Sequence, residues 1–178
     1  MSNNKRTVMS TQDIELAIQR IALQILEKNH GRQELAIVGI HTCGVYVAER
    51  IHAFIEKQEN IEIPFGSLDI NLYRDDWSLV SQNPVVKTTN IPFDVDNTTL
   101  VLVDDVIFTG RTIRAAMDAI MDYGRPTTIQ LVALVDRGGR ELPIQPDFTG
   151  MHTAILTNER INVLLGEDRT GGEVIIES

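Results

Sequence analysis

Residues 100–112 read LVLVDDVIFTGRT, and this stretch decides the fold. It begins with a short apolar run rich in β-branched residues, which predicts a strand buried on both faces. Two adjacent acids follow, Asp104 and Asp105, and a Thr-Gly-Arg-Thr turn then leads into a helical pattern. The stretch therefore predicts a strand that brings two carboxylates to its C-terminal end, followed by a loop of phosphate size at a helix N-terminus.

This arrangement suits a ligand that carries both sugar hydroxyls and a phosphate. The two carboxylates can accept hydrogen bonds from the 2′- and 3′-hydroxyls of a ribose. The backbone N–H groups of the turn, the Thr109 and Thr112 hydroxyls and the following helix N-terminus converge on one anion. Hydrogen bonds to a charged group contribute about 1.5–3 kcal/mol each, whereas the helix dipole contributes about 0.3–1 kcal/mol. Gly110 lets the backbone approach the anion, because a side chain there would occupy phosphate space.

Other interpretations of the stretch fit it less well. The chain has no GxxxxGK[ST], so a P-loop would lack its lysine, and no GxGxxG follows the first strand, as a dinucleotide site requires. An aspartyl-phosphate enzyme would carry its acids two residues apart on an early strand. An acidic turn that only caps a helix would explain Asp105, but it would not explain two threonines flanking Gly-Arg.

The composition is that of one ordinary globular domain. The chain has 178 residues, of which 43% are hydrophobic and 23% charged, so it can form a sizeable core. No run approaches the roughly 18 apolar residues of a membrane span, and the N-terminal MSNNKRTVMS lacks the apolar segment of a secretory signal. A single cysteine, Cys43, excludes an internal disulfide and fits a reducing compartment. We expect a single domain over residues 1–178, located in the cytoplasm and not in a membrane.

The charge balance limits the partners. The formal net charge is −9, from 16 basic and 25 acidic residues. Such a chain disfavours nonspecific nucleic-acid binding, which depends on clustered lysines and arginines. The same field repels a polyphosphate, so an anionic ligand must be captured locally by backbone N–H groups, a few arginines or a bound metal ion.

Strand and helix patterns alternate along the rest of the chain. Helical periodicity covers 10–29, capped by Ser10 or Thr11 and closed by Gly31, then 45–57, and then a segment from Thr112 that ends before Gly124 and Pro126. Buried or extended runs cover 35–40, 65–70, 98–103 and 128–135, and short apolar runs in 151–178 predict small strands at the sheet margin. This order predicts an α/β fold with a mostly parallel sheet flanked by helices. Ligands bind such sheets at the carboxyl ends of the strands.

Residues 74–96 show little periodicity and contain two prolines. A connection of this length inside a compact domain is usually functional or disordered. Because Arg74 and Lys87 lie within it, we favour a mobile flap over the site, with a hairpin that has no ligand role as the alternative.

Several motifs resemble a known family. VLVDDVIFTGRT is similar to the phosphoribosyl pyrophosphate (PRPP) signature of type I phosphoribosyltransferases. Together with VGIHTCGVYVAERI (38–51), DINLYRDD (69–76) and IRAAMDAIMDYGRPTTIQLVALVDRGGRELPI (113–144), it resembles the PyrR family of pyrimidine-operon attenuation proteins, which also have uracil phosphoribosyltransferase activity. The resemblance covers about residues 10–150. It implies the type I phosphoribosyltransferase fold, a mostly parallel central sheet flanked by helices with a small hood region.

The resemblance implies the reaction of uracil with PRPP to give UMP and pyrophosphate, with Mg²⁺ on the pyrophosphate. Asp104 and Asp105 would then hold the ribose diol, and Arg74 would fold over the pyrophosphate. The transition state would resemble an oxocarbenium ion, so the protein mainly positions reactants and excludes water. The residues implied to hold the 5′-phosphate are Val106, Ile107, Phe108, Thr109, Gly110, Arg111 and Thr112.

Two further segments receive roles by the same resemblance. Thr42, Cys43 and Gly44 match the pyrophosphate turn, where a cis peptide bond is expected at Thr42–Cys43. Asp136 and Arg137 match the segment that closes over the base and the metal, with Asp136 as a metal ligand.

The sequence departs from the family pattern at the pyrophosphate turn. The turn usually reads Lys-Thr-Arg-Gly, and here Cys43 stands in the arginine position. Losing a bidentate cation should weaken pyrophosphate binding. A reactive thiol and a plain small loop residue both remain open for Cys43.

The resemblance also implies a regulatory partner. RNA-binding members hold an mRNA hairpin on a basic dimer face, for which Arg20 and Arg140 are the candidates here. The net charge of −9 and the few basic residues after RELP argue against this role. The alternatives are an attenuation regulator that responds to UMP or PRPP with little enzyme activity, and a transferase for another base. A homodimer or a higher homo-oligomer is expected.

Overall fold

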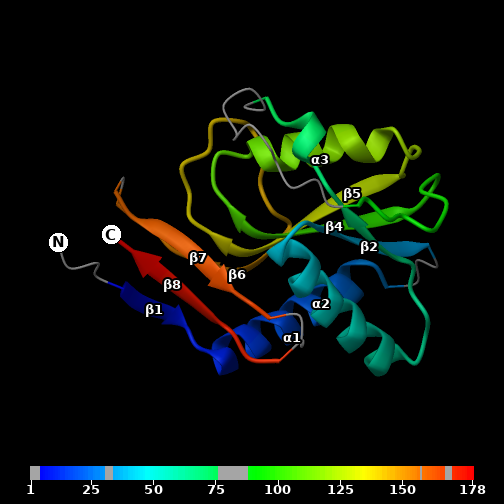
Figure 1. The fold of residues 1–178 in the computed structure, drawn as a ribbon. Coiled ribbons are helices and arrows are strands. Elements are labelled where there is room, and N and C mark those ends of the chain that lie inside the picture. The colour runs from blue at the N-terminus through cyan, green and yellow to red at the C-terminus, as the bar shows by residue number, and fades with distance from the viewer. Residues whose placement is uncertain (1–4, 31–33, 76–87, 157, 167–169) are drawn as a thin grey trace.

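Five parallel strands form the central sheet of the computed structural model, which describes residues 5–30, 34–75, 88–156, 158–166 and 170–178 (Figure 1). In spatial order they are β3 (Phe65–Leu68), β2 (Leu35–Ile40), β4 (Thr99–Ile107), β5 (Thr128–Asp136) and β6 (Phe148–His152). Each neighbouring pair is parallel. The predicted parallel α/β sheet is confirmed, and the strand of the 100–112 stretch lies at its centre.

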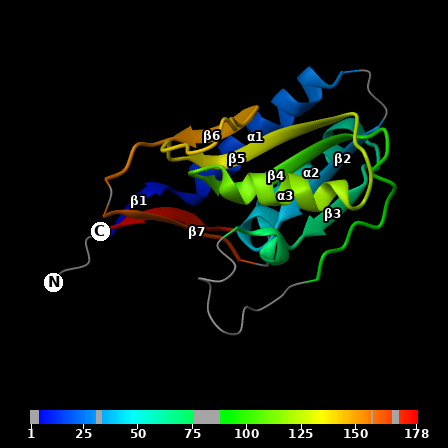
Figure 2. The same ribbon diagram turned by 90° about the horizontal axis from the view of Figure 1, so that it is seen from above.

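Helices cover both faces of this sheet (Figure 2). Helices α1 (Thr11–Lys28) and α2 (Cys43–Glu59) pack on one face, and α3 (Arg111–Met121) packs on the other. Alternate residues of β4 enter the two cores, because side chains of a strand point to opposite faces. Val101 and Val103 join the core beneath α1 and α2, whereas Leu100 and Leu102 join the core beneath α3. This two-sided burial explains why the strand is a continuous apolar run.

A second sheet is antiparallel and lies beside the first (Figure 1). It contains β1 (Lys5–Met9), β8 (Glu173–Glu177) and β7 (Arg160–Leu164) in that order, and we call it the hood sheet. The sequence patterns predicted the C-terminal strands at the margin of the main sheet, and this was wrong for β7 and β8. They pair with each other, and β8 also pairs with β1, a strand that local periodicity did not reveal. Residues 154–156 form no strand.

Several element boundaries differ from the predicted ones. Ser10 is the N-cap of α1, and its side chain accepts the Asp13 N–H at 3.3 Å while the Asp13 carboxylate accepts the Ser10 N–H at 2.8 Å. This reciprocal capping box settles the choice between Ser10 and Thr11. The extended run predicted over 65–70 ends at Leu68, and a short 3₁₀ helix, η1 (Asn71–Tyr73), follows it. The closing role given to Gly31, and most of the flap predicted over 74–96, lie outside the described residues.

Candidate active site

The sequence predicted a strand over 98–103 with the two adjacent acids just after it. In the structure β4 continues to Ile107, so both acids lie within the strand. The pairing of β4 with β2 stops at Val103, but its pairing with β5 continues to Ile107 opposite Asp136. The longer neighbour therefore extends the strand past the acids. Asp104 and Asp105 consequently lie where β4 has lost β2 as a neighbour, at the carboxyl edge of the sheet.

A pocket of about 340 Å³ opens at this edge. It brings together Arg74, Asp104 and all seven predicted phosphate-loop residues, and it adds three residues to which the sequence gave no role. Asp105, the 42–44 turn, Asp136 and Arg137 do not line it. Among the residues that the structure describes, the lining is Arg74, Asp75, Asp104, Val106, Ile107, Phe108, Thr109, Gly110, Arg111, Thr112, Ile113 and Glu141.

Burial dominates the electrostatics of the acid pair. Asp104 is only 5% exposed and accepts the Asp105 N–H on Oδ1 at 3.0 Å. Burial raises the pKa of Asp104 well above its ordinary value, and the neighbouring Asp105 charge raises it further. Burial also raises the pKa of Asp105. Hydrogen bonds with the Asp104 side chain and with backbone N–H groups act to lower this pKa, but burial outweighs them. Hydroxyl donors from a ligand would stabilise the charged forms that burial disfavours.

The 41–44 turn packs directly against the acid pair. A Cβ added to Gly44 would lie 2.8 Å from the Val103 carbonyl oxygen and 3.1 Å from Asp104 Cα. Glycine is therefore needed here for close approach of two backbones. The predicted site of the cis peptide bond was wrong by one residue, because the cis bond joins His41 to Thr42. Helix α2 begins at Cys43, so the Thr42–Cys43 peptide already belongs to the helix start.

Cys43 is directed toward the hood sheet. Its Sγ donates to the Val163 carbonyl of β7 at 3.4 Å, and the residue does not line the pocket. This contact favours the plain structural interpretation of the cysteine.

The phosphate loop is shaped by the backbone of Gly110. This residue has φ +92°, a conformation that side chains rarely adopt, and it is the N-cap of α3, which begins at Arg111 and not at Thr112. A Cβ there would meet Ile144 and Leu142 at the ordinary contact distances of 3.4 and 3.5 Å. The structural reason for glycine is thus its backbone conformation, whereas the sequence argument had been the space for phosphate. The first turn of α3 forms part of the pocket wall.

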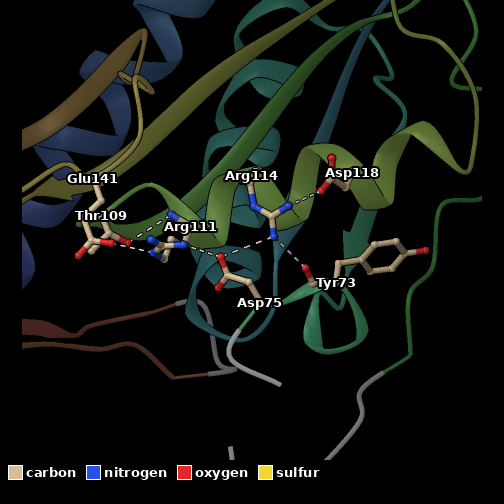
Figure 3. Close-up of polar contacts among 7 residues, drawn as sticks. All are labelled: Tyr73, Asp75, Thr109, Arg111, Arg114, Asp118 and Glu141. Atoms are coloured by element: carbon tan, nitrogen blue, oxygen red, sulfur yellow. Dashed lines mark hydrogen bonds and ion pairs between the residues drawn. The ribbon is translucent and has the colours of Figure 1, made fainter. Parts of the chain in front are cut away.

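Arg111 connects three segments around the pocket (Figure 3). Its guanidinium lies 2.6 Å from the Asp75 carboxylate and 2.7 Å from the Glu141 carboxylate. The backbone N–H of Arg111 donates to Thr109 Oγ1 at 3.3 Å. Sequence reasoning missed Asp75 and Glu141. Both lie within motifs quoted above, next to Arg74 and Arg140, but nothing local in the sequence pairs them with Arg111.

Asp136 and Arg137 form a second group, behind Phe108. The two Asp136 oxygens accept the Gly138 N–H at 2.9 Å and an Arg140 N–H at 2.7 Å. Burial acts to raise the pKa of Asp136, but these hydrogen bonds and the Arg140 charge outweigh it, so the pKa lies below its ordinary value. The Arg137 guanidinium stacks on the Phe108 ring at 3.9 Å from its centroid. The predicted base segment therefore contacts the phosphate loop through Phe108.

The two candidate RNA-binding arginines are engaged within the chain. Arg20 donates to the Gly150 carbonyl of β6. Arg140 donates to the Ile144 and Phe108 carbonyls at 2.8 and 2.9 Å, besides its bond to Asp136.

The donor set around the pocket fits one kind of metal. Within the part of the chain that the structure describes, no group of three His, Cys, Asp or Glu side chains forms a metal cage. Mg²⁺ is usually bound by one or two carboxylates, water and substrate phosphates. The pocket carboxylates suit Mg²⁺, because this ion needs only one or two protein carboxylates when water and the phosphates of a bound substrate complete its coordination. In the same described residues, no helix has the length and apolar character needed to cross a bilayer.

Comparisons with known proteins agree with this geometry. Residues 6–170 match the family model described as phosphoribosyl transferase domain. The chain is 50% identical over 177 residues to the Bifunctional protein PyrR of Syntrophobacter fumaroxidans, covering 99% of this chain and 95% of that protein. It is 47% identical to the Bifunctional protein PyrR of Deinococcus radiodurans, covering 99% of this chain and 96% of that protein.

Solved structures show the same fold at low sequence identity. A hypoxanthine-guanine phosphoribosyltransferase from Bacillus anthracis superposes with a TM-score of 0.68 at 16% identity, covering 88% of this chain and 86% of that one. The hypoxanthine phosphoribosyltransferase of Trypanosoma cruzi superposes with a TM-score of 0.70 at 14% identity, covering 96% of this chain and 95% of that one.

Proposed function

The chain belongs to the phosphoribosyltransferase family, as a member of its PyrR branch, and we propose on this premise that it transfers phosphoribosyl from PRPP to uracil. The products are UMP and pyrophosphate. The observation that carries the proposal is the pocket that joins buried Asp104, Arg74 and the complete 106–112 loop. It provides, within one cavity, acceptors for a sugar and donors for a phosphate.

The reaction exchanges one bond at the anomeric carbon. The C1′–O bond to pyrophosphate breaks with its electron pair on the oxygen, and uracil N1 forms the new bond to C1′. The N1 proton of uracil ends on the released pyrophosphate, which balances the reaction. Asp104 and Asp105 orient the ribose through its hydroxyls, and their negative charge favours the positive charge that develops on the ring. The 106–112 loop holds the 5′-phosphate, and Arg74 neutralises the leaving pyrophosphate. These roles require positioning and charge stabilisation, with no covalent intermediate on the protein.

A magnesium ion bound with PRPP would supply further positive charge at the pyrophosphate. Asp104, the member of the acid pair that lines the pocket, could contribute a carboxylate to its binding. Asp136, the ligand expected from the sequence, already has both oxygens bound by Arg140 and Gly138. These hydrogen bonds support our proposal of Asp104 over Asp136 for this role.

Steady-state formation of UMP from uracil, PRPP and Mg²⁺ tests the activity. We expect turnover with uracil, and PRPP binding that weakens in Asp104→Asn and Asp105→Asn. Hypoxanthine and guanine, assayed in parallel, test the alternative of a transferase for another base. The proposal fails if no pyrimidine base is turned over while both variants bind PRPP as the wild type does.

A second function is favoured by the relatives, which are named bifunctional. We propose that UMP or PRPP in the same pocket modulates binding of a pyrimidine-operon leader RNA. A gel-shift series with a leader hairpin, at several stated salt concentrations and with and without UMP, measures this. Binding that strengthens with UMP and weakens with salt supports it. Absent or salt-independent binding contradicts it.

We also propose that the protein is a homodimer or a larger homo-oligomer. Sedimentation velocity at micromolar concentration should show species larger than the 19.9 kDa chain. A monomer alone would contradict this assembly.

A further inference from the structure

Two carboxylates line the pocket in which the proposed function places an anion. Asp75 and Glu141 both belong to its wall, together with the phosphate-loop residues. Bare carboxylates at this place would repel a phosphate, and the chain as a whole already carries a net charge of −9. Their charge must be compensated locally before the pocket can take its ligand.

Arg111 supplies this compensation in a specific geometry (Figure 3). Its Nη1 lies 2.6 Å from Asp75, and its Nε lies 2.7 Å from Glu141, so two different edges of one guanidinium bind the two acids. Only a side chain with several donors in a fixed fork can do this, and a lysine cannot reproduce it. The next arginine of the helix, Arg114, is farther from Asp75 at 3.9 Å and pairs with Asp118 at 2.9 Å. Among the described residues, Arg111 is therefore the one seen in close ion pairs with both Asp75 and Glu141.

These ion pairs contribute little to folding. The side chains of Arg111, Asp75 and Glu141 are 48%, 38% and 53% exposed. Ion pairs at this exposure are screened by solvent and are weak stabilisers. They lie at the pocket wall, and Arg111 is the first residue of α3, directly after the predicted phosphate-loop glycine. This position points to a role in ligand binding.

Building on the proposed function, we propose that Arg111 is a positioning residue that masks Asp75 and Glu141, so that the 106–112 loop can accept the 5′-phosphate of PRPP. The two carboxylates in turn hold the guanidinium at the pocket wall, and phosphate binding is left to the loop backbone and its threonines. Without Arg111 the group changes from a net charge of −1 to −2. Without the two acids, the guanidinium is free and the pocket becomes more attractive to phosphate.

Four proteins test this masking: wild type, Arg111→Gln, Asp75→Asn with Glu141→Gln, and the triple variant. PRPP binding is measured by calorimetry at low and high salt, and KM for PRPP is compared with kcat. We expect Arg111→Gln to raise Kd and KM for PRPP about tenfold at low salt, less at high salt, and to change kcat little. The double variant should bind PRPP at least as tightly as the wild type.

The triple variant separates masking from direct contact. If Arg111 acts by masking, removing the acids restores PRPP binding to within about threefold of the wild type, because no carboxylate remains to repel the phosphate. A triple variant as weak as Arg111→Gln would overturn the proposal and assign Arg111 to the phosphate itself. Unchanged binding in Arg111→Gln would overturn it as well.

Matched controls remove the same charges elsewhere, at Asp118 on α3 and at Arg125 beyond its C-terminal end. Asp118→Asn and Arg125→Gln lie outside the pocket wall and should leave Kd and KM for PRPP within about twofold of the wild type. Comparable weakening in Arg125→Gln would show a general charge effect and would overturn the masking role. Circular dichroism checks that each variant is folded. Failure of the wild type to bind PRPP would contradict the proposed function instead, so the two failures are distinguishable.

Discussion

At the scale of single residues, Asp104 combines burial with a proposed role that requires charge. Its carboxylate is 5% exposed inside β4, and burial raises its pKa well above the ordinary value. The unfolded chain therefore loses this proton at a lower pH than the folded chain does. Stability consequently falls as the pH rises from the unfolded pKa to the folded one.

Asp104→Asn should stabilise the protein at neutral pH while it weakens PRPP binding. Asparagine keeps an acceptor for the Asp105 N–H but has no charge to desolvate, so we expect a gain of about 1–3 kcal/mol at pH 7.5. The gain should shrink as the pH falls and nearly vanish at about pH 3, below the ordinary aspartate pKa, where the aspartic acid is mostly protonated in both states. Urea unfolding at the two pH values measures it, with exposed Asp118→Asn as control. A variant less stable than the wild type at pH 7.5 would contradict this account.

Gly44 is the residue through which the 41–44 turn approaches the acid pair. Gly44→Ala adds a methyl group 2.8 Å from a backbone oxygen of β4, and this backbone cannot move without shifting Asp104. We expect a loss of about 1–3 kcal/mol in unfolding free energy and a higher Kd for PRPP. In the control Gly171→Ala, the added methyl group meets no atom of the described residues within 4 Å, and the expected cost is that of a left-handed backbone at φ +64°. Equal PRPP affinity in Gly44→Ala and wild type would refute the role of this close packing.

At the scale of elements, a buried amide pair joins α1 to β5. Asn29, at the end of α1, and Gln130 in β5 are each 5% exposed and exchange two hydrogen bonds of 2.8 Å. Asn29 also donates to the Ile25 carbonyl at 2.9 Å. The pair fixes the end of the helix on the sheet, because buried amides need each other as partners.

Replacing either Asn29 or Gln130 alone should lower the free energy of unfolding by more than half of the loss seen when both are replaced. We expect Asn29→Leu and Gln130→Leu each to lose about 1–3 kcal/mol, because each leaves a buried amide without its partner. The double variant should lose less than the sum of the two losses, with a coupling of about 1 kcal/mol or more. Urea unfolding of the four proteins gives the cycle. Additive losses would show that the two amides do not depend on each other.

At the scale of the whole molecule, the hood sheet shares a core with the main sheet. Met9 of β1, Val163 of β7 and Val174 of β8 belong to the same buried cluster as the inner faces of α1 and α2. The hood therefore has no separate core of its own in the described part of the chain. We accordingly predict that hood and main sheet unfold together, as the single domain expected over residues 1–178 would.

The substitution Val174→Ala, in strand β8 of the hood sheet, tests whether the hood sheet and the main sheet unfold together. Val174 is fully buried, so the substitution should lower the stability of the whole protein by about 2 kcal/mol. Leu164→Ala, in the same sheet but 48% exposed, should cost less than about 0.5 kcal/mol. Urea unfolding followed by far-UV and near-UV circular dichroism should show one transition that moves as a whole. A separate early transition in Val174→Ala would instead identify the hood as an independent unit.

The central part of the fold could be predicted because its information is local. The apolar run before Asp104, the glycine turn and the amphipathic pattern of α3 are neighbours in the chain, and parallel strands place their carboxyl ends at one edge. Asp104, Asp105 and the 106–112 loop were therefore predicted to lie together in the site. The pocket contains Asp104 and the loop together with Arg74, whereas Asp105 does not line it.

The sequence by itself thus determined the strand–loop–helix unit, the parallel sheet and the family resemblance. Only the tertiary structure decided that β1 pairs with β8, that pairing with β5 extends β4 through the acids, and that Arg111 binds Asp75 and Glu141. The last contacts join residues 36 and 30 positions apart. Periodicity reports which face of an element is buried, but which distant side chains meet depends on the path of the whole chain.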